Sequence, residues 1–195
     1  MQTTRGIVLR VIRHSDSRII VSLFTEHYGM LSAGVRLTRG GRTGGRSALW
    51  QMLNVVEMSV DYRPASDLQK ISDVSISTPW MDLPYSPVKA SISMFLGEFL
   101  FRSLRGEGEN RPLFSFLYNS LRWLDEAEGN VANFHVLLMI RMTRFLGIWP
   151  GMAGYGRNMV YDMKNACFSD TLPVHGQYLE PGDAKWIPLL LNMDY

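Results

Sequence analysis

The pattern of apolar residues changes at a segment that contains Pro79, Pro84 and Pro87. Before these prolines, apolar and polar residues alternate in short runs, which is typical of strands with one face toward water. After them, apolar residues recur every three or four positions, as in amphipathic helices. The sequence therefore predicts a multidomain α+β protein, with a β-domain over residues 1–80 and a mostly α-helical domain over residues 81–195.

Five short strands are predicted in the β-domain, and a long loop separates the third from the fourth. The fourth alternates most cleanly, with an apolar residue at every second position from Val56 to Tyr62, and we expect Tyr62 to face inward with the others. The second has apolar residues on both faces, which favours a strand in a small closed barrel or one covered by a second element. Five strands with one long basic loop predict an oligonucleotide-binding (OB) fold, a small β-barrel. The predicted strands are residues 6–14, 17–25, 30–37, 54–62 and 68–77.

The long loop carries a run of arginines and glycines. Residues 36–46 contain four arginines, four glycines and no acid, and so many glycines disfavour a helix. Residues 1–46 carry eight arginines against two acids, a net charge of +6, whereas the whole chain carries +2. The β-domain (residues 1–80, called the head below) therefore begins with a strongly basic segment, whereas the rest of the chain is mildly acidic. This asymmetry indicates that the head binds a polyanion, and a flexible basic loop suits a phosphate backbone. A solvated surface loop is the alternative for this run alone.

We expect the nucleic-acid contacts of the head to be mainly phosphate contacts. Aromatic residues that could stack on bases are few, which favours electrostatic, sequence-tolerant binding. The stacking candidates are Phe24, Tyr28, Trp50 and Tyr62, of which Phe24 and Tyr62 could instead belong to the core. The predicted nucleic-acid-binding residues are Arg13, Arg18, Arg36, Arg39, Arg42 and Arg46.

Three amphipathic helices are predicted after the prolines. The first begins after Ser86 or Ser91, the second begins at Pro112, and the third is capped by Asn130, because serine, asparagine and an N-terminal proline are favoured where helices begin. A final helix is expected near the C-terminus, and Pro188 lies inside it and would break or kink it.

A β-hairpin is predicted between the third and the final helix. Residues 155–170 are rich in glycine and asparagine, and we expect Val160 and Tyr161 to pair with residues 166–168. The hairpin would form a small β-element within the helical domain.

The sequence offers no catalytic or metal-binding constellation. Cys167 is the single cysteine, so these 195 residues hold no disulfide among themselves and no multi-cysteine zinc site. The four histidines lack metal-ligand spacing, and neither a nucleophile elbow nor a P-loop sequence occurs. The acidic run at residues 125–128 is interpreted as solvated surface. We therefore predict a binding protein with no catalytic residue, no metal and no cofactor.

The N-terminus lacks the apolar segment of a signal peptide, and no apolar run approaches the length of a membrane span. We therefore expect a cytoplasmic protein with no membrane partner.

Several segments resemble the bacterial recombination mediator family RecO. In the head they are Gly-Ile-Val-Leu-Arg at residues 6–10, Ser-Arg-Ile-Ile-Val at 17–21 and Phe-Thr-x-x-x-Gly at 24–29. In the helical part they are residues 99–105 and the Arg-Phe-Leu-Gly-Ile-x-Pro segment at 144–150. The resemblance covers most of the chain, and the order and spacing of these segments carry it.

The resemblance implies an N-terminal OB domain that binds single- and double-stranded DNA, followed by a helical domain. It also implies annealing of complementary strands coated with single-stranded DNA-binding protein (SSB), and loading of RecA recombinase at gaps together with the partner RecR. It implies no bond-making chemistry and a nucleoid-associated location. The alternative is an adaptor whose helical domain docks partner proteins and whose barrel is not the main DNA binder. DNA binding that survives removal of residues 36–46 would favour the adaptor.

Two features depart from the family pattern. Some members carry a four-cysteine zinc site soon after the Leu-Gly-Ile-x-Pro segment, where this chain has residues 154–157 and retains only Cys167. Family chains also usually continue further, so we expect the last helices of the family to be missing here. The residues expected to hold the hairpin together in place of the metal are Tyr155, Val160, Tyr161 and Phe168.

Overall fold

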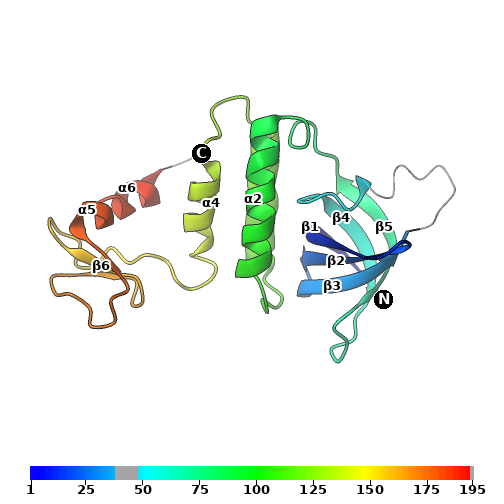
Figure 1. Ribbon diagram of the computed structural model, residues 1–195, viewed down its shortest axis with the longest axis horizontal. Coiled ribbons are helices and arrows are strands. Elements are labelled where there is room, and N and C mark those ends of the chain that lie inside the picture. Colours follow the sequence, from blue (N-terminus) through cyan, green and yellow to red (C-terminus); the bar gives the residue numbers. More distant parts are fainter. Residues whose placement is uncertain (38–47, 194–195) are drawn as a thin grey trace. The chain divides into compact units, whose positions relative to one another are not determined.

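The computed structural model describes residues 1–37 and 48–193 (Figure 1). The predicted DNA-binding residues Arg39, Arg42 and Arg46 lie outside the described residues. The chain divides into two compact units, Met1–Val131 and Ala132–Tyr195. A five-stranded antiparallel sheet followed by helices confirms the predicted α+β class. The predicted domain boundary between residues 80 and 81 stays a prediction.

All five predicted strands of the head are present, with ends that differ from the predicted ones by a few residues. Their order in the sheet is β3-β2-β1-β4-β5, and the neighbouring strands are antiparallel. A parallel bridge between Ala33 and Gln69 joins β3 to the chain just before β5 and brings the two edges of the sheet together as a barrel. The strands are β1 (Gln2–Ser15), β2 (Arg18–Thr25), β3 (Gly29–Arg36), β4 (Val55–Asp61) and β5 (Lys70–Thr78).

The barrel core is formed by the apolar residues that alternate along the strands. Strand β2 lies in the barrel, and its C-terminal end is also covered on the outer face, because Phe24 is fully buried and packs 6.3 Å from the ring of Phe114. The inward orientation predicted for Tyr62 is wrong, since β4 ends at Asp61 and Tyr62 is 45% exposed. Buried core residues include Ile19, Val21, Leu23, Trp50, Val56, Met58 and Val60.

Two helices complete the first unit, α2 (Pro87–Ser103) and α3 (Arg111–Glu126). Ser86 is the N-cap residue of α2, as one of the two alternatives predicted. The connection between the helices packs against the start of β3, where the N–H of Met30 donates to the carbonyl of Glu107 at 2.9 Å. Gly29 has a φ of 65° there, and a side chain at this position would overlap the carbonyl of Gly108. The helices are thereby fixed to the head.

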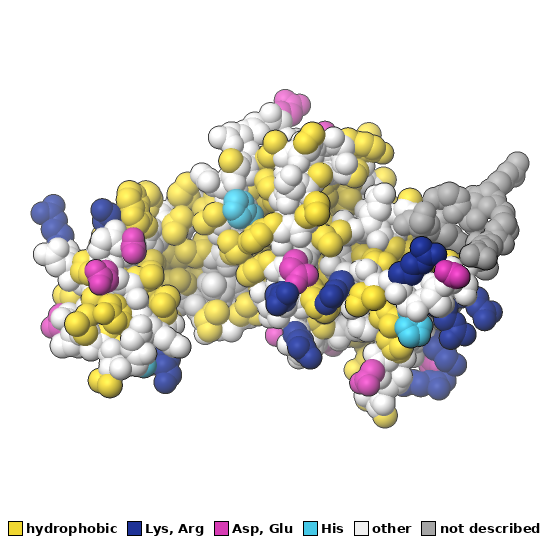
Figure 2. All heavy atoms as spheres, in the orientation of Figure 1, with side chains coloured by type: hydrophobic (Ala, Val, Ile, Leu, Met, Phe, Trp, Pro, Cys, Tyr) yellow, Lys and Arg dark blue, Asp and Glu magenta, His cyan; other side chains and the backbone are white. Residues whose placement is uncertain are grey.

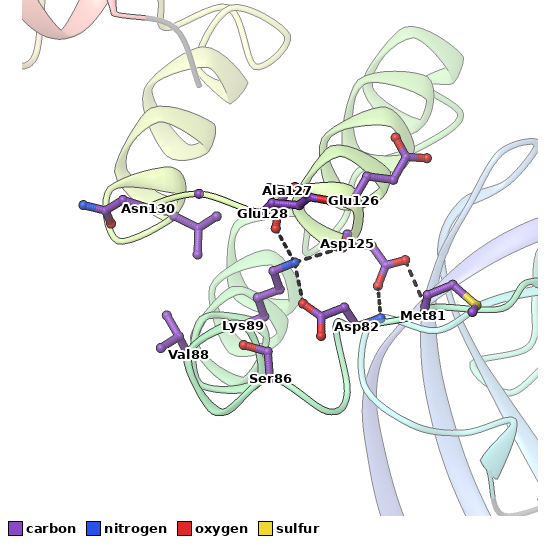
Figure 3. Close-up of a pocket in the computed structure, with 12 residues that line it drawn as sticks. Met81, Asp82, Ser86, Val88, Lys89, Asp125, Glu126, Ala127, Glu128 and Asn130 are labelled. Carbon is purple, nitrogen blue, oxygen red and sulfur yellow. Dashed lines mark hydrogen bonds and ion pairs between the residues drawn. The ribbon is translucent and has the colours of Figure 1, made fainter.

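A buried charge cluster attaches the proline-rich connection to the end of α3. The carboxylate of Asp125 accepts the backbone N–H groups of Met81 and Asp82, both at 2.9 Å (Figure 3). It also accepts the backbone N–H of Leu83 at 2.7 Å. Asp125 is only 8% exposed, so its interpretation as solvated surface was wrong. Its partners come from a distant part of the sequence, which the local acidic pattern could not indicate.

Lys89 of α2 completes this cluster. Its Nζ donates to the carbonyls of Asp125 at 2.9 Å and Ala127 at 2.7 Å, and lies 2.7 Å from a carboxylate oxygen of Asp82. These carbonyls lack partners within the helix because α3 ends there. A buried lysine therefore satisfies the C-terminus of α3, where a positive charge is also favoured by the helix dipole.

The second unit contains the predicted hairpin. Tyr161 is opposite Phe168 in the register, and both Tyr155 and Tyr161 lie edge-on to Phe168 with ring centres 5.0 Å apart. A third strand, which was not predicted, pairs Tyr161 with Leu179. The strands are β6 (Val160–Asp162), β7 (Cys167–Ser169) and β8 (Tyr178–Leu179).

The helices of the second unit are those predicted, but the first of them begins at a different residue. The third predicted helix, α4 (Phe134–Met142), follows Asn133 as its N-cap, so the assignment of Asn130 as the cap was wrong. The final helix is broken as predicted, into α5 (Pro181–Ala184) and α6 (Ile187–Asn192). Pro188 lies in the first turn of α6, where its missing N–H needs no partner.

Within residues 1–37 and 48–193, no three histidine, cysteine, aspartate or glutamate side chains gather as a metal site. None of the helices in these ranges is long and apolar enough to cross a membrane.

Candidate nucleic-acid interface

Two of the predicted arginines lie directly opposite one another on the outer face of the barrel. Arg18 of β2 is in register with Arg36 of β3, and both are exposed. No acid pairs with either of them among the described residues. Like charges directly opposite on neighbouring strands repel and destabilise the pair. An anion bound between the two guanidinium groups would remove this repulsion.

Arg13 is placed differently. It is opposite Ile19, whose side chain faces the core, so Arg13 projects on the other face of the sheet from Arg18. Its Nη2 lies 3.6 Å from Asp16, and both side chains are well exposed. An exposed pair of this length contributes little and leaves Arg13 able to contact another anion. Arg39, Arg42 and Arg46 stay predictions.

Arg5 is a structural residue of the head. Its Nε and Nη2 donate to the two carboxylate oxygens of Glu26, each at 3.0 Å. The guanidinium also lies 5.4 Å from the ring centre of Phe114 and 5.1 Å from that of Tyr118. The hydrogen bond to Glu26 raises the pKa of Arg5, and the same bond lowers the pKa of Glu26. This arginine therefore ties the head to α3 and is not available to a ligand.

The outer face of β2 and β3 borders a groove of about 490 Å³. Ile20 of β2 is opposite Ile12 of β1 on one side and Gly34 of β3 on the other. The next row along the strands holds Ser22 and Ser32, whose hydroxyl oxygens are 3.1 Å apart. This face and the loop between strands 4 and 5 are the surface through which OB folds bind oligonucleotides.

The connection between β4 and β5 forms one wall of the groove. Gln69 is buried and holds the connection closed, because its Oε1 accepts the N–H of Arg63 at 2.8 Å and its Nε2 donates to the carbonyl of Ser66 at 2.6 Å. Tyr62 lies in this wall and stacks on Tyr28 with ring centres 4.7 Å apart and planes 22° apart. Of the stacking candidates, Tyr28 and Tyr62 thus form a pair, whereas Phe24 and Trp50 are buried.

The end of α2 forms the facing wall, and sequence reasoning missed it. Phe101 and Arg105 both line the groove. The guanidinium of Arg10 lies 4.8 Å from the ring centre of Phe101 and so joins β1 to this wall. No local pattern marks these residues, because their place depends on how α2 packs against the barrel.

Charge distinguishes this groove from a larger pocket beside Lys89. That pocket, of about 600 Å³, is lined by acids that include Asp82, Asp125, Glu126 and Glu128 (Figure 3). A polyanion would be repelled there. On the face shown in Figure 2, Lys and Arg side chains gather over the strands of the head. The outer face of β2 and β3 is therefore the candidate nucleic-acid interface.

Comparisons with known proteins show which proteins this chain resembles. Residues 1–80 match the family model described as "Recombination protein O N terminal", and residues 84–153 match "Recombination protein O C terminal". A protein of Phocaeicola vulgatus named DNA repair protein RecO is 42% identical over 195 residues, which cover all of this chain and 81% of that protein. The protein of the same name from Bacteroides fragilis is 39% identical over 196 residues, with the same coverage. The one from Porphyromonas gingivalis is 28% identical over 98% of this chain and 80% of its own length.

Proposed function

The chain belongs to the RecO family of DNA repair proteins, and on this premise we propose that it is a DNA-binding recombination mediator without a catalytic site. In this proposal residues 1–80 form the OB domain that binds single- and double-stranded DNA, and residues 81–195 form the helical domain. The observation that carries the proposal is the exposed pair Arg18 and Arg36, which are in register on the outer face and have no acidic partner among the described residues.

Phosphate contacts of this kind would serve strand annealing. Two complementary strands repel each other, and arginines that neutralise their phosphates lower this repulsion and release counterions. Because phosphates carry no sequence information, binding would tolerate any sequence, as annealing requires. The loop residues Arg39, Arg42 and Arg46 would extend the contact, and Arg13, on the other face of the sheet, would contact a separate phosphate. Annealing makes and breaks no covalent bond, so the proposal needs no catalytic residue, metal or cofactor.

The finer parts of the proposal follow from the family. The protein would act in the cytoplasm at the nucleoid, on strands coated with SSB, and would work with RecR to load the recombinase RecA. The acidic pocket beside Lys89 is consistent with a division of labour in which the helical residues meet proteins and the basic head meets DNA.

The proposal is tested by replacing both arginines of the pair with alanine in the full chain. Each charge-assisted contact to phosphate contributes about 1.5–3 kcal/mol, so losing both contacts in Arg18→Ala with Arg36→Ala should weaken binding to single strands about a hundredfold or more. The rate of annealing of complementary oligonucleotides should fall in parallel, with no dependence on sequence.

A matched control removes two arginines from α3, Arg111→Ala with Arg122→Ala. These arginines already have acidic partners, Glu109 at 2.7 Å and Glu126 at 2.9 Å. The control lowers the net charge by the same amount but should bind and anneal like the wild type. Equal losses in both double variants would mean that only the total charge matters and would refute the assigned site.

A further inference from the structure

We propose that the groove beside the arginine pair holds the bases of an unpaired strand, with Tyr62 and Phe101 as its stacking surfaces and Gly34 as the open entrance between phosphates and bases. The proposal rests on the DNA binding proposed above and goes further, because it assigns a base-binding subsite and includes the end of α2 in it.

The register of the strands places the phosphate site and the groove side by side. Arg18 is opposite Arg36, and two residues further along the same strands Ile20 is opposite Gly34. Side chains two residues apart share a face and are separated by about 7 Å. Ile20 lines the groove. A strand whose phosphates lie at the arginine pair therefore has its bases within reach of the groove.

Gly34 leaves the surface between the arginine pair and the groove open. A Cβ built at this position has no neighbouring heavy atom within 4 Å, and the residue is exposed. Its backbone is not in the left-handed region, so a larger residue could be placed there without strain. The absence of a side chain at Gly34 is thus not required by the fold, and it keeps the outer face flat beside the arginines.

The aromatic walls are held in place before any ligand arrives. One face of Tyr62 rests on Tyr28, whose hydroxyl donates to Oε1 of Gln2 at 3.2 Å. Phe101 is half-buried on α2 with Arg10 over its ring. Stacking on rings that are already ordered costs little conformational entropy. Stacking of bases on aromatic rings is also sequence-tolerant, because every base has a π-face.

The shape and charge of the groove favour an unpaired strand. In a duplex each base is already stacked on its neighbours, so its faces cannot reach an aromatic wall. A volume of about 490 Å³ is in the range of small-ligand sites, room for about one or two nucleotides. Arg105 and Asp67 both line the groove, and Arg10 lies beside Phe101. The two arginines outweigh the single acid, so the charge of the groove does not repel a polyanionic strand.

The test measures the affinity of the full chain for a labelled oligo-thymidylate strand and for a duplex of the same length. Gly34→Leu should obstruct the entrance, and Phe101→Leu should remove a stacking surface while keeping an apolar side chain. Each should weaken single-strand binding about fivefold or more and change duplex binding by less than about twofold. Gly34→Ala, the matched control, should bind both like the wild type.

The outcomes separate this inference from the proposed function. Suppose that folded Gly34→Leu and Phe101→Leu bind a single strand like the wild type, while the Arg18 and Arg36 double variant binds both single strand and duplex more weakly. This result would refute the base-binding groove and would still support the phosphate site. Equal losses for single strand and duplex in Gly34→Leu also overturn it. Thermal unfolding verifies that the variants are folded. A side chain added at position 34 enters open space, so Gly34→Leu tests the groove even if Phe101→Leu is destabilised.

Discussion

Replacing Asp125 by asparagine should destabilise the first unit by about 3 kcal/mol. One carboxylate oxygen accepts the N–H groups of Asp82 and Leu83, and the other accepts that of Met81. An amide can keep one oxygen in place, but its NH₂ group then faces an N–H donor. A buried donor without an acceptor costs about 1–3 kcal/mol, and the remaining bonds lose the strength that a charged acceptor gives.

The same residue predicts a pH dependence. Burial raises the pKa of Asp125, but the backbone hydrogen bonds and the nearby Lys89 lower it by more, so the pKa of the folded state lies below its ordinary value. The stabilisation is therefore fully present above the ordinary pKa of about 3.9 and is lost as the pH falls through the lower pKa of the folded state. The difference in free energy of unfolding between wild type and Asp125→Asn should therefore shrink as the pH falls below about 3.9.

Urea unfolding followed by tryptophan fluorescence measures both effects. The matched control is Glu126→Gln, since this neighbour is exposed and contacts Arg122 on the same helix, and it should unfold at the wild-type urea concentration. Amide exchange at residues 81–83 should rise in Asp125→Asn and stay unchanged in the control. If Asp125→Asn unfolds at the wild-type urea concentration, the carboxylate does not hold the connection to α3.

The remaining predictions concern the basic loop and metal. Arg39→Ala, Arg42→Ala and Arg46→Ala together should weaken binding to all DNA sequences about equally and flatten the log–log salt dependence by about 2, at roughly 0.7 for each lost contact to a single strand; a folded triple variant with an unchanged slope would contradict the loop's role. Chelator treatment should leave the melting temperature unchanged, because Cys167 is the single cysteine and cannot hold a structural tetrahedral zinc. A fall in melting temperature would show that metal supports the fold.

Local patterns predicted the head well but could not place the ends of its elements. The alternation in β4 identified the strand and its buried face, yet it continued to Tyr62, beyond the last paired residue. Asn130 and Asn133 are both suitable caps, and only the structure distinguishes them. Asp125 shows a deeper limit, because its partners are 42 to 44 residues away. Charge near a helix end does not reveal whether distant backbone groups cover it.

Only part of the candidate site was predicted, because local patterns do not show which distant residues come into contact. Sequence gives the charge of the head but not the partner of each arginine, so it does not show that Arg5 is paired with Glu26 and withdrawn from DNA binding. The pairing of Arg18 with Arg36 follows from the register of β2 and β3, which the strand ends predicted from the sequence do not determine. Phe101 belongs to the groove only because α2 packs beside the barrel, and helical periodicity carries no information about that packing.

The central claim, that Arg18 and Arg36 bind phosphates, is tested most directly by the salt dependence of single-strand affinity in the full chain. Each contact to a single strand contributes about 0.7 to the slope of log affinity against log salt concentration. Arg18→Ala with Arg36→Ala should therefore flatten the slope by about 1.4, and Arg111→Ala with Arg122→Ala should leave it at the wild-type value. A folded Arg18 and Arg36 double variant that keeps the wild-type slope would contradict the claim.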